Sequence, residues 1–169
     1  MATNPLSRCN GTIYLAADHA GFAHKEAVKA WLESEDYAVI DEGAFHYDPE
    51  DDFTDVIART AIAVAEAPTT RLGIIFGGSG QGEAMMANRF AGVRATVYYG
   101  GGDEIIKLSR EHNDANVLSI GARLVPLDET KRVIWDWLHL ETSQNEKYAR
   151  RNRKLDILAP VRSTPPPSL

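Results

Sequence analysis

The 169-residue chain has one cysteine, Cys9, which excludes an internal disulfide framework and a CxxC metal site. No apolar stretch approaches the ~18 residues that a membrane span needs, and residues 1–10 lack the apolar segment of a secretory signal. Basic residues are not in excess, since 18 Lys and Arg stand against 24 Asp and Glu, for a net charge of -6. This balance argues against a protein that coats nucleic acid. We therefore expect a cytoplasmic protein whose partners include neither nucleic acid nor a membrane.

The composition that remains is suited to one domain of ordinary size. Apolar residues make up 44% of the chain and charged residues 25%, close to the average for globular proteins. Residues 1–11 lack periodicity, and residues 159–169 contain four prolines, which neither a helix nor a central strand accepts. We expect a flexible N-terminal segment over 1–11, a single domain over 12–158 and a Pro-rich disordered tail over 159–169.

Short apolar runs alternate with helical patterns along this domain. The runs predict strands at residues 12–17, 38–40, 72–76, 95–98 and 117–120. Their nearly continuous apolar character is typical of strands buried on both faces. Apolar residues at helical spacing predict helices at about 22–34, 54–66 and 128–140. The alternation predicts an α/β fold, a three-layer α/β/α sandwich around a five-stranded parallel sheet, with ligands bound beyond the carboxyl ends of the strands.

Two loops that follow predicted strands are candidates for ligand binding. Asp18 and His19 come directly after the first strand, where they can meet a ligand or serve as a helix cap and a packed side chain. Residues 77–82 follow the strand at 72–76 and include four glycines, which let backbone amides crowd around a ligand next to a helix N-terminus. The loop matches neither the dinucleotide fingerprint nor the Walker A motif. A merely tight turn would need fewer glycines, so the pattern favours ligand binding.

Three groups of ionisable side chains could carry chemistry. Glu83 adjoins the candidate oxyanion donors, as a general base would, although a carboxylate there often only complements the helix dipole. His112 is followed by polar residues and can donate a proton near neutral pH, whereas a structural role is commoner for a lone His. Residues 147–154 hold five positive charges and no acid. Arg150 and Lys154 share a helix face there, which can clamp a phosphate dianion or simply face solvent.

The remaining His and acidic residues give no sign of a metal site. His24, His46 and His139 have no carboxylate or His partner at metal-ligand spacing. Residues 41–55 hold seven Asp and Glu and no Lys or Arg, which predicts a solvated loop and not a metal cage.

Taken together, these motifs resemble the type B ribose-5-phosphate isomerases, in the wider group that includes galactose-6-phosphate isomerase. The resemblance runs from about residue 12 to 158. Its motifs are residues 18–21, 77–83 with 87–89, 110–113, and the basic helix that ends at 155–158. It implies a Rossmann-like fold and a cofactor-independent aldose–ketose isomerase that interconverts ribose 5-phosphate and ribulose 5-phosphate through an enediolate. It also implies a homodimer or homotetramer with each active site at a subunit interface.

The resemblance assigns expected roles to individual residues. Many members use a Cys of the glycine loop as the base, and the matching position here is Gly77. One branch carries Gly-Gly-Ser-Gly-x-Gly-Glu and uses that Glu, which makes Glu83 the expected base. His112 resembles the proton donor that opens the furanose ring. The residues expected to bind substrate are Asp18, His19, Gly78, Ser79, Gly80, Gln81, Gly82, Asn113, Arg123, Arg150 and Lys154.

Alternatives stay open at this point. One is a hexose-6-phosphate isomerase of the same family, acting on allose or galactose 6-phosphate. Another is a non-catalytic sugar-phosphate-binding regulator, and a third is a flavodoxin-like nucleotide binder, which the missing fingerprint disfavours. Two departures from the family pattern are compatible with a different substrate: Lys154 stands where an Arg is usual, and residues 100–102 are all glycine.

Overall fold

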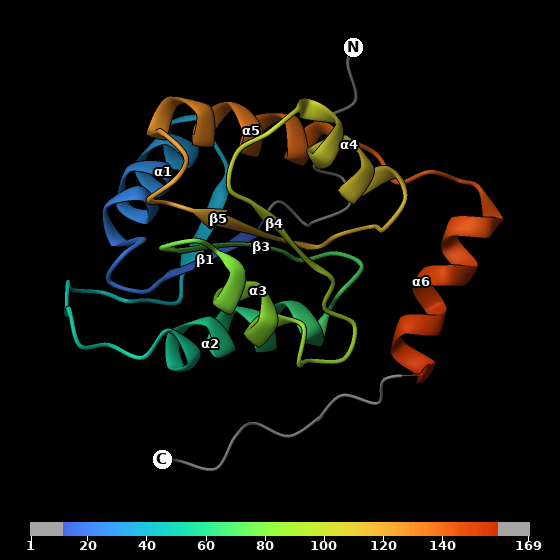
Figure 1. Ribbon diagram of the computed structural model, residues 1–169, viewed down its shortest axis with the longest axis horizontal. Helices are drawn as coiled ribbons and strands as arrows, with labels where there is room; N and C mark the ends of the chain where they lie inside the picture. The colour runs from blue at the N-terminus through green and yellow to red at the C-terminus, as the bar shows by residue number, and fades with distance from the viewer. Residues whose placement is uncertain (1–11, 159–169) are drawn as a thin grey trace.

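The computed structural model describes residues 12–158, and the two expected terminal segments, 1–11 and 159–169, lie outside the described residues (Figure 1). Five parallel strands form one sheet in the order β2-β1-β3-β5-β4. The strands are β1 (Thr12–Ala17), β2 (Ala38–Asp41), β3 (Leu72–Gly77), β4 (Ala95–Tyr98) and β5 (Val117–Gly121). The helices are α1 (Phe22–Ser34), α2 (Phe53–Glu66), α3 (Gln81–Ala87), α4 (Asp103–Glu111), α5 (Leu127–His139) and α6 (Glu146–Leu158). The predicted three-layer α/β/α architecture is confirmed.

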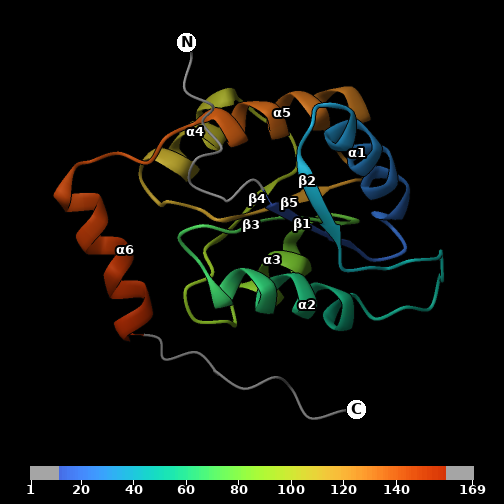
Figure 2. The same cartoon turned by 180° about the vertical axis from the view of Figure 1, so that it is seen from behind.

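The helices cover both faces of the sheet. Helices α1, α4 and α5 lie on one face, and α2 and α3 lie on the other (Figures 1 and 2). Alternate residues of the central strands point to opposite faces: Leu15 and Ile74 pack in one cluster with Trp137 of α5, whereas Ile75 packs with Ile57 of α2. This two-sided burial explains the continuous apolar runs.

The edge strands depart from that expectation. All residues of β3 and β5 are buried, but β2 alternates between exposed and half-buried residues, and Ile40 is 43% exposed. In β4 only Tyr98 is buried. The prediction of burial on both faces is therefore wrong for β2 and β4, because an edge strand has a neighbour on one side only and is less completely covered by helices.

Because the strands are parallel, they all begin on one side of the sheet and end on the opposite side. We call the side where the strands end the carboxyl edge and the side where they begin the amino edge; neither term refers to the edge strands β2 and β4. The connection after β1 leads to β2 on one side, whereas the connection after β3 leads toward β5 and β4 on the other. Neighbouring strands whose connections diverge leave a crevice between their following loops. Here the connections diverge after β1 and β3, and we call the position between the ends of these strands at the carboxyl edge, next to the two loops singled out in the sequence, the crevice.

Helix α6 confirms the predicted basic helix but stands apart from the sandwich. None of its residues, all in the described part of the chain, is buried. Figures 1 and 2 show it beyond the end of the sheet, away from the loop that joins β1 to α1. No helix within residues 12–158 is long and apolar enough to cross a membrane.

Candidate active site

Glu83 and Gly77 fit each other at the end of β3. The Glu83 carboxyl group folds back over the α-carbon of Gly77, so a Cβ at position 77 would overlap its carboxyl carbon and both oxygens. Glu83 is only 5% exposed. The missing side chain at position 77 therefore makes room for the carboxylate supplied from the first turn of α3.

The glycine loop between them is held by β5 and by the start of the segment that follows it. The amide of Ala122 donates to the Gly77 carbonyl at 2.8 Å, and the amide of Arg123 donates to the Gly78 carbonyl at 3.1 Å. The Ser119 hydroxyl donates to the Gly80 carbonyl at 2.6 Å. Gly80 adopts a left-handed conformation with φ 77°, which favours glycine. The loop is thus a rigid, backbone-lined wall beside Glu83.

The other loop residues lie nearer to solvent. Ser79 and Gly82 are half-buried, and Gln81 is exposed at the start of α3. The Ser79 hydroxyl lies 3.4 Å from the amide of Gln81, to which it serves as acceptor. The exposed Arg123 extends along the loop, with its guanidinium close to Gly78. These residues border the outer side of the crevice.

Asp18 faces the same crevice from the end of β1. It is 7% exposed, and its Oδ1 accepts a hydrogen bond of 2.9 Å from the amide of Gly21. Burial raises the pKa of Glu83, and the negative charge of Asp18 raises it further, against the opposing effect of a hydrogen bond from the backbone amide of Glu83. A carboxylate with a raised pKa is a stronger proton acceptor, which suits a general base.

His19 is held by Asp51, a residue that the sequence did not single out. Nδ1 of His19 lies 2.6 Å from Oδ1 of Asp51, and the amide of His19 also donates to that oxygen at 3.2 Å. The hydrogen bond to Asp51 raises the pKa of His19, and the charges of Asp18 and Asp51 add to it, while burial and Arg123 oppose it. The pair directs Nε2 of His19 away from Asp51 and favours the imidazolium.

The prediction of a solvated acidic loop over 41–55 is wrong for two of its members. Asp41 ends β2 and is half-buried, and both of its oxygens accept hydrogen bonds of 2.7 Å from Lys25 Nζ, while Lys29 Nζ lies 3.0 Å from Oδ2. The Asp51 side chain is 13% exposed, and its Oδ2 is buried with no hydrogen-bond partner among the described residues. Seven acids close together in sequence gave no signal for these two, because their partners lie at least 12 residues away.

Asp18, His19 and Asp51 form the one three-residue cluster within residues 12–158 whose ligand atoms lie within 4.8 Å of one another. One oxygen of each carboxylate is already engaged, since Asp18 Oδ1 accepts from the Gly21 amide and Asp51 Oδ1 bonds to Nδ1 of His19. The cluster thus consists of the His19–Asp51 pair and of Asp18, whose side chain holds the loop that leads into α1.

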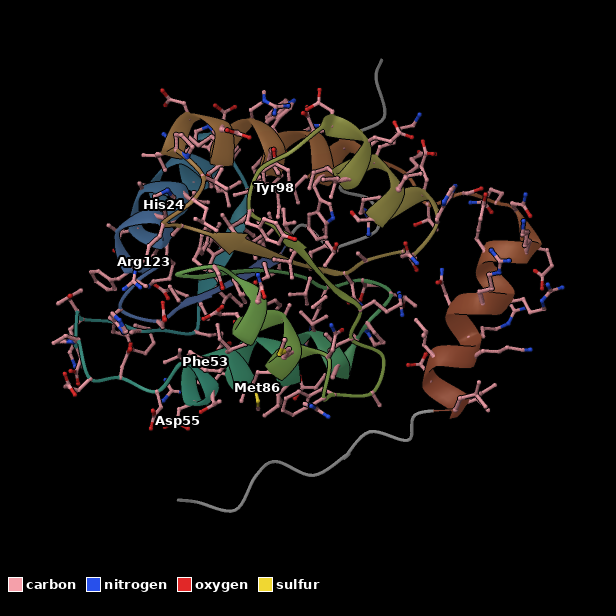
Figure 3. The ribbon with its side chains drawn as sticks, viewed as in Figure 1. His24, Phe53, Asp55, Met86, Tyr98 and Arg123 are labelled. Atoms are coloured by element: carbon pink, nitrogen blue, oxygen red, sulfur yellow. The ribbon has the colours of Figure 1, made fainter. Side chains whose placement is uncertain are left out.

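The remaining predicted residues lie at the opposite edge. His112 ends α4 and Asn113 follows it, just before β5 begins, so they lie at the amino edge. The length of β5, five residues at about 3.3 Å each, separates this edge from the carboxyl edge by roughly 15 Å. Figure 3 shows Arg123 at one end of the sheet and α6 at the other. A single chain therefore does not bring His112 near Glu83.

Arg150 and Lys154 lie on α6 and are exposed. The side of α6 that contacts the rest of the chain carries Asn152 and Asp156, which bond the His112 carbonyl and the Gly92 amide at 3.1 and 3.0 Å. At about 100° per residue, Arg150 and Lys154 point to the other side of the helix. The two basic side chains thus face outward, away from their own chain.

Hollows of about 360 and 370 Å³ in the described part of the chain lie elsewhere. The first lies between α4 and α5, and the second lies beneath α6. Their linings come from residues 88–96, 103–107, 113–115, 132–140 and 155–156, not from the crevice that holds Glu83. The chemistry of the crevice, and not the size of a cavity, identifies the candidate site.

Known proteins share both the sequence and the fold. The family model for ribose/galactose isomerases matches residues 13–155. Ribose-5-phosphate isomerase B of Mycolicibacterium paratuberculosis is 36% identical over 152 residues, which cover 90% of this chain and 92% of that protein.

Solved structures of ribose-5-phosphate isomerases B share the fold of this chain. The structure of ribose-5-phosphate isomerase B from Mycoplasma genitalium with bound ribulose-5-phosphate has a TM-score of 0.79 and 29% identity, covering 88% of this chain and 94% of that one. The Clostridium thermocellum ribose-5-phosphate isomerase B has a TM-score of 0.80 and 33% identity, covering 87% and 96%. With the family model spanning nearly all of the described fold, the chain belongs to the ribose/galactose isomerase family.

Proposed function

We propose that the chain interconverts ribose 5-phosphate and ribulose 5-phosphate by proton transfer, without a cofactor. The observation that carries this proposal is the buried Glu83 carboxylate, seated over Gly77 beside the backbone wall of the glycine loop. A base next to fixed amide donors is the arrangement that proton abstraction alpha to a carbonyl requires. The names of the relatives, and the ribulose-5-phosphate bound in the Mycoplasma genitalium protein, support this substrate pair.

The reaction starts by opening the furanose ring. His112 donates a proton to the ring oxygen as the bond from that oxygen to C1 breaks, and the C1 hydroxyl releases its proton to solvent. Asp18, His19 and Asn113 contact the sugar hydroxyl groups and hold the open chain. The aldehyde then lies against the glycine loop.

Isomerisation follows on the open chain. Glu83 takes the proton from C2, and the negative charge that develops on O1 is stabilised by amides of the loop from Gly78 to Gly82. The O2 proton moves to O1, and Glu83 returns its proton to C1, which gives the ketose. The substrate undergoes no net oxidation or reduction, so the reaction needs no redox cofactor, and the loop amides take the oxyanion-stabilising role that a Lewis-acid metal would otherwise fill.

A second copy of the chain completes the site. Glu83 and His112 lie at opposite edges of one chain, and Arg150 and Lys154 face away from it. We propose that the amino edge and α6 of one copy meet the carboxyl edge of another in a homodimer or homotetramer. Arg123 of the copy that gives the carboxyl edge, together with Arg150 and Lys154 of the copy that gives α6, then binds the phosphate, which positions the sugar for reaction.

The same proposal gives one catalytic domain over residues 12–158 and a cytoplasmic location, where phosphorylated sugars are substrates. The experiment that tests it is a substrate panel in the presence of a chelator. Ribose 5-phosphate is compared with allose 6-phosphate and galactose 6-phosphate by kcat/KM. We expect ribose 5-phosphate to be preferred and turnover to survive chelation. Preference for a hexose phosphate would move the chain to the hexose branch, and binding without turnover would make it a regulator.

A further inference from the structure

The imidazole of His112 stacks on a ring of α6. The rings of His112 and Tyr148 lie 3.9 Å apart between centroids with an angle of 20° between their planes. We propose that Tyr148 is a positioning residue for His112, which fixes the imidazole in the orientation that protonates the sugar ring oxygen. This inference rests on the proposed function and adds a role for a residue that does not touch the substrate.

The backbone around His112 is held independently of Tyr148. Arg94 donates to the carbonyls of Asn113 and Asp114 at 3.2 and 2.9 Å and pairs with the Asp114 carboxylate at 2.9 Å. Asn152 donates to the His112 carbonyl at 3.1 Å. These contacts fix where the α-carbon of His112 lies, but they do not set the rotation of its side chain. The stack with Tyr148 supplies that constraint.

The position of Tyr148 on α6 makes the constraint specific. Tyr148, Asn152 and Asp156 recur every four residues and form the side of the helix that faces the rest of the chain. Arg150 lies about 200° around the helix from Tyr148. The same helix therefore presents a cationic side outward and an aromatic ring inward. A substitution of Tyr148 can thus change the placement of His112 without removing a phosphate ligand.

Ring opening can be separated experimentally from the isomerisation step. Ribose 5-phosphate closes to a furanose and must be opened before its C2 proton can be removed. Ribulose 5-phosphate cannot close a furanose, because its C5 oxygen carries the phosphate. Exchange of its C1 proton with solvent deuterium therefore requires Glu83 and the loop but no ring opening. A residue that acts through His112 affects the first assay and spares the second.

The test uses the full chain with Tyr148→Ala, Tyr148→Leu and Tyr148→Phe, and with Lys147→Ala as the matched control on the same helix. A stack of two aromatic rings contributes enough free energy to change a rate constant by up to about tenfold. We expect Tyr148→Ala and Tyr148→Leu to lower kcat for ribose 5-phosphate about five- to tenfold at nearly unchanged KM. Tyr148→Phe keeps the ring and restores kcat to within about twofold of wild type. Exchange of the C1 proton of ribulose 5-phosphate stays at the wild-type rate in all four variants, which also shows that they are folded.

Three results would overturn the inference. Wild-type kcat in Tyr148→Ala would show that the stack does not matter. An equal loss in both assays would place the effect on the whole site instead of on the acid, and a raised KM with normal kcat would place it on phosphate binding. A wild-type enzyme that turns over neither ribose 5-phosphate nor ribulose 5-phosphate would be a failure of the proposed function itself, distinct from all three.

Discussion

At the carboxyl edge, Glu83 and Asp18 are buried and fixed by the backbone of their own chain, whereas at the amino edge Arg150 and Lys154 stand exposed on a helix outside the sandwich. A base needs a desolvated and rigid setting, because its strength and position decide the rate. A phosphate clamp needs cations that reach outward. The difference fits the proposal that one chain holds the base in place and offers its acid and its phosphate clamp to a neighbour.

The strongest way to break the carboxyl edge is Glu83→Gln. The amide keeps the shape of the side chain but does not accept the C2 proton at neutral pH. A positioned general base contributes about 10²–10⁴-fold, so kcat should fall by that factor while KM changes little. Steady-state kinetics and solvent deuterium exchange measure the loss. More than about a tenth of the wild-type kcat in a folded variant would exclude Glu83 as the base.

The same variant should be more stable than the wild type at neutral pH. The folded state raises the pKa of Glu83, mainly through burial, so the ionised carboxylate opposes folding at any pH above that pKa. The gain from Gln should be complete above the folded pKa and vanish as the pH falls to the unfolded value, where both states carry the proton. Urea unfolding at pH 7 and pH 4 checks the sign. If the difference in stability between the variant and the wild type were the same at pH 7 and pH 4, the site would impose no cost on the charge of Glu83.

Next in size is Gly77→Ala, which attacks the fit between Gly77 and Glu83. The new methyl group would occupy the space of the carboxyl group and push it away from the loop. We expect a loss of kcat approaching that of Glu83→Gln, about 10²-fold, with the fold kept because only the end of a side chain must move. Gly102→Ala is the control, since a Cβ there meets no described atom within 4 Å. Normal activity in Gly77→Ala would mean that the observed position of Glu83 is not the productive one.

The phosphate clamp at the amino edge, formed by Arg150 and Lys154, should respond in KM and not in kcat. Charge-assisted contacts to an anion are each worth about 1.5–3 kcal/mol, so Arg150→Ala should raise KM at least tenfold. Arg151→Ala is the neighbouring control. Lys154→Arg should keep or lower KM, because a guanidinium offers a bidentate fork to phosphate. An unchanged KM in Arg150→Ala would remove this residue from the phosphate site.

The smallest effect concerns the pair formed by His19 and Asp51. Because the hydrogen bond to Asp51 raises the pKa of His19, Asp51→Asn should lower that pKa, and the imidazolium should be lost at a lower pH than in the wild type. Titration of the imidazole by NMR measures the shift directly. The same titration curve in both proteins would show that Asp51 holds the ring without affecting its charge.

Residue patterns predict the fold well and the site in part. The bounds of β1, β4 and α1 agree with the expected ranges to the residue, because apolar periodicity reports burial on the sheet and helix faces. Glu83 and the glycine loop could be located because a strand end, a glycine run and a carboxylate are adjacent in sequence. Asp51 and Tyr148 could not, because their partners His19 and His112 are 32 and 36 residues away and only the folded chain brings them together.

The central claim is that each active site combines the carboxyl edge of one copy with the amino edge of another, and mixing two inactive variants tests it most directly. Glu83→Gln lacks the base and His112→Ala lacks the acid, so each alone should turn over ribose 5-phosphate poorly. In an equal mixture refolded together, half of the dimers are mixed, and one of their two sites holds both intact residues. The account predicts recovery to about a quarter of wild-type turnover. Turnover no higher than the average of the two separate variants would contradict it.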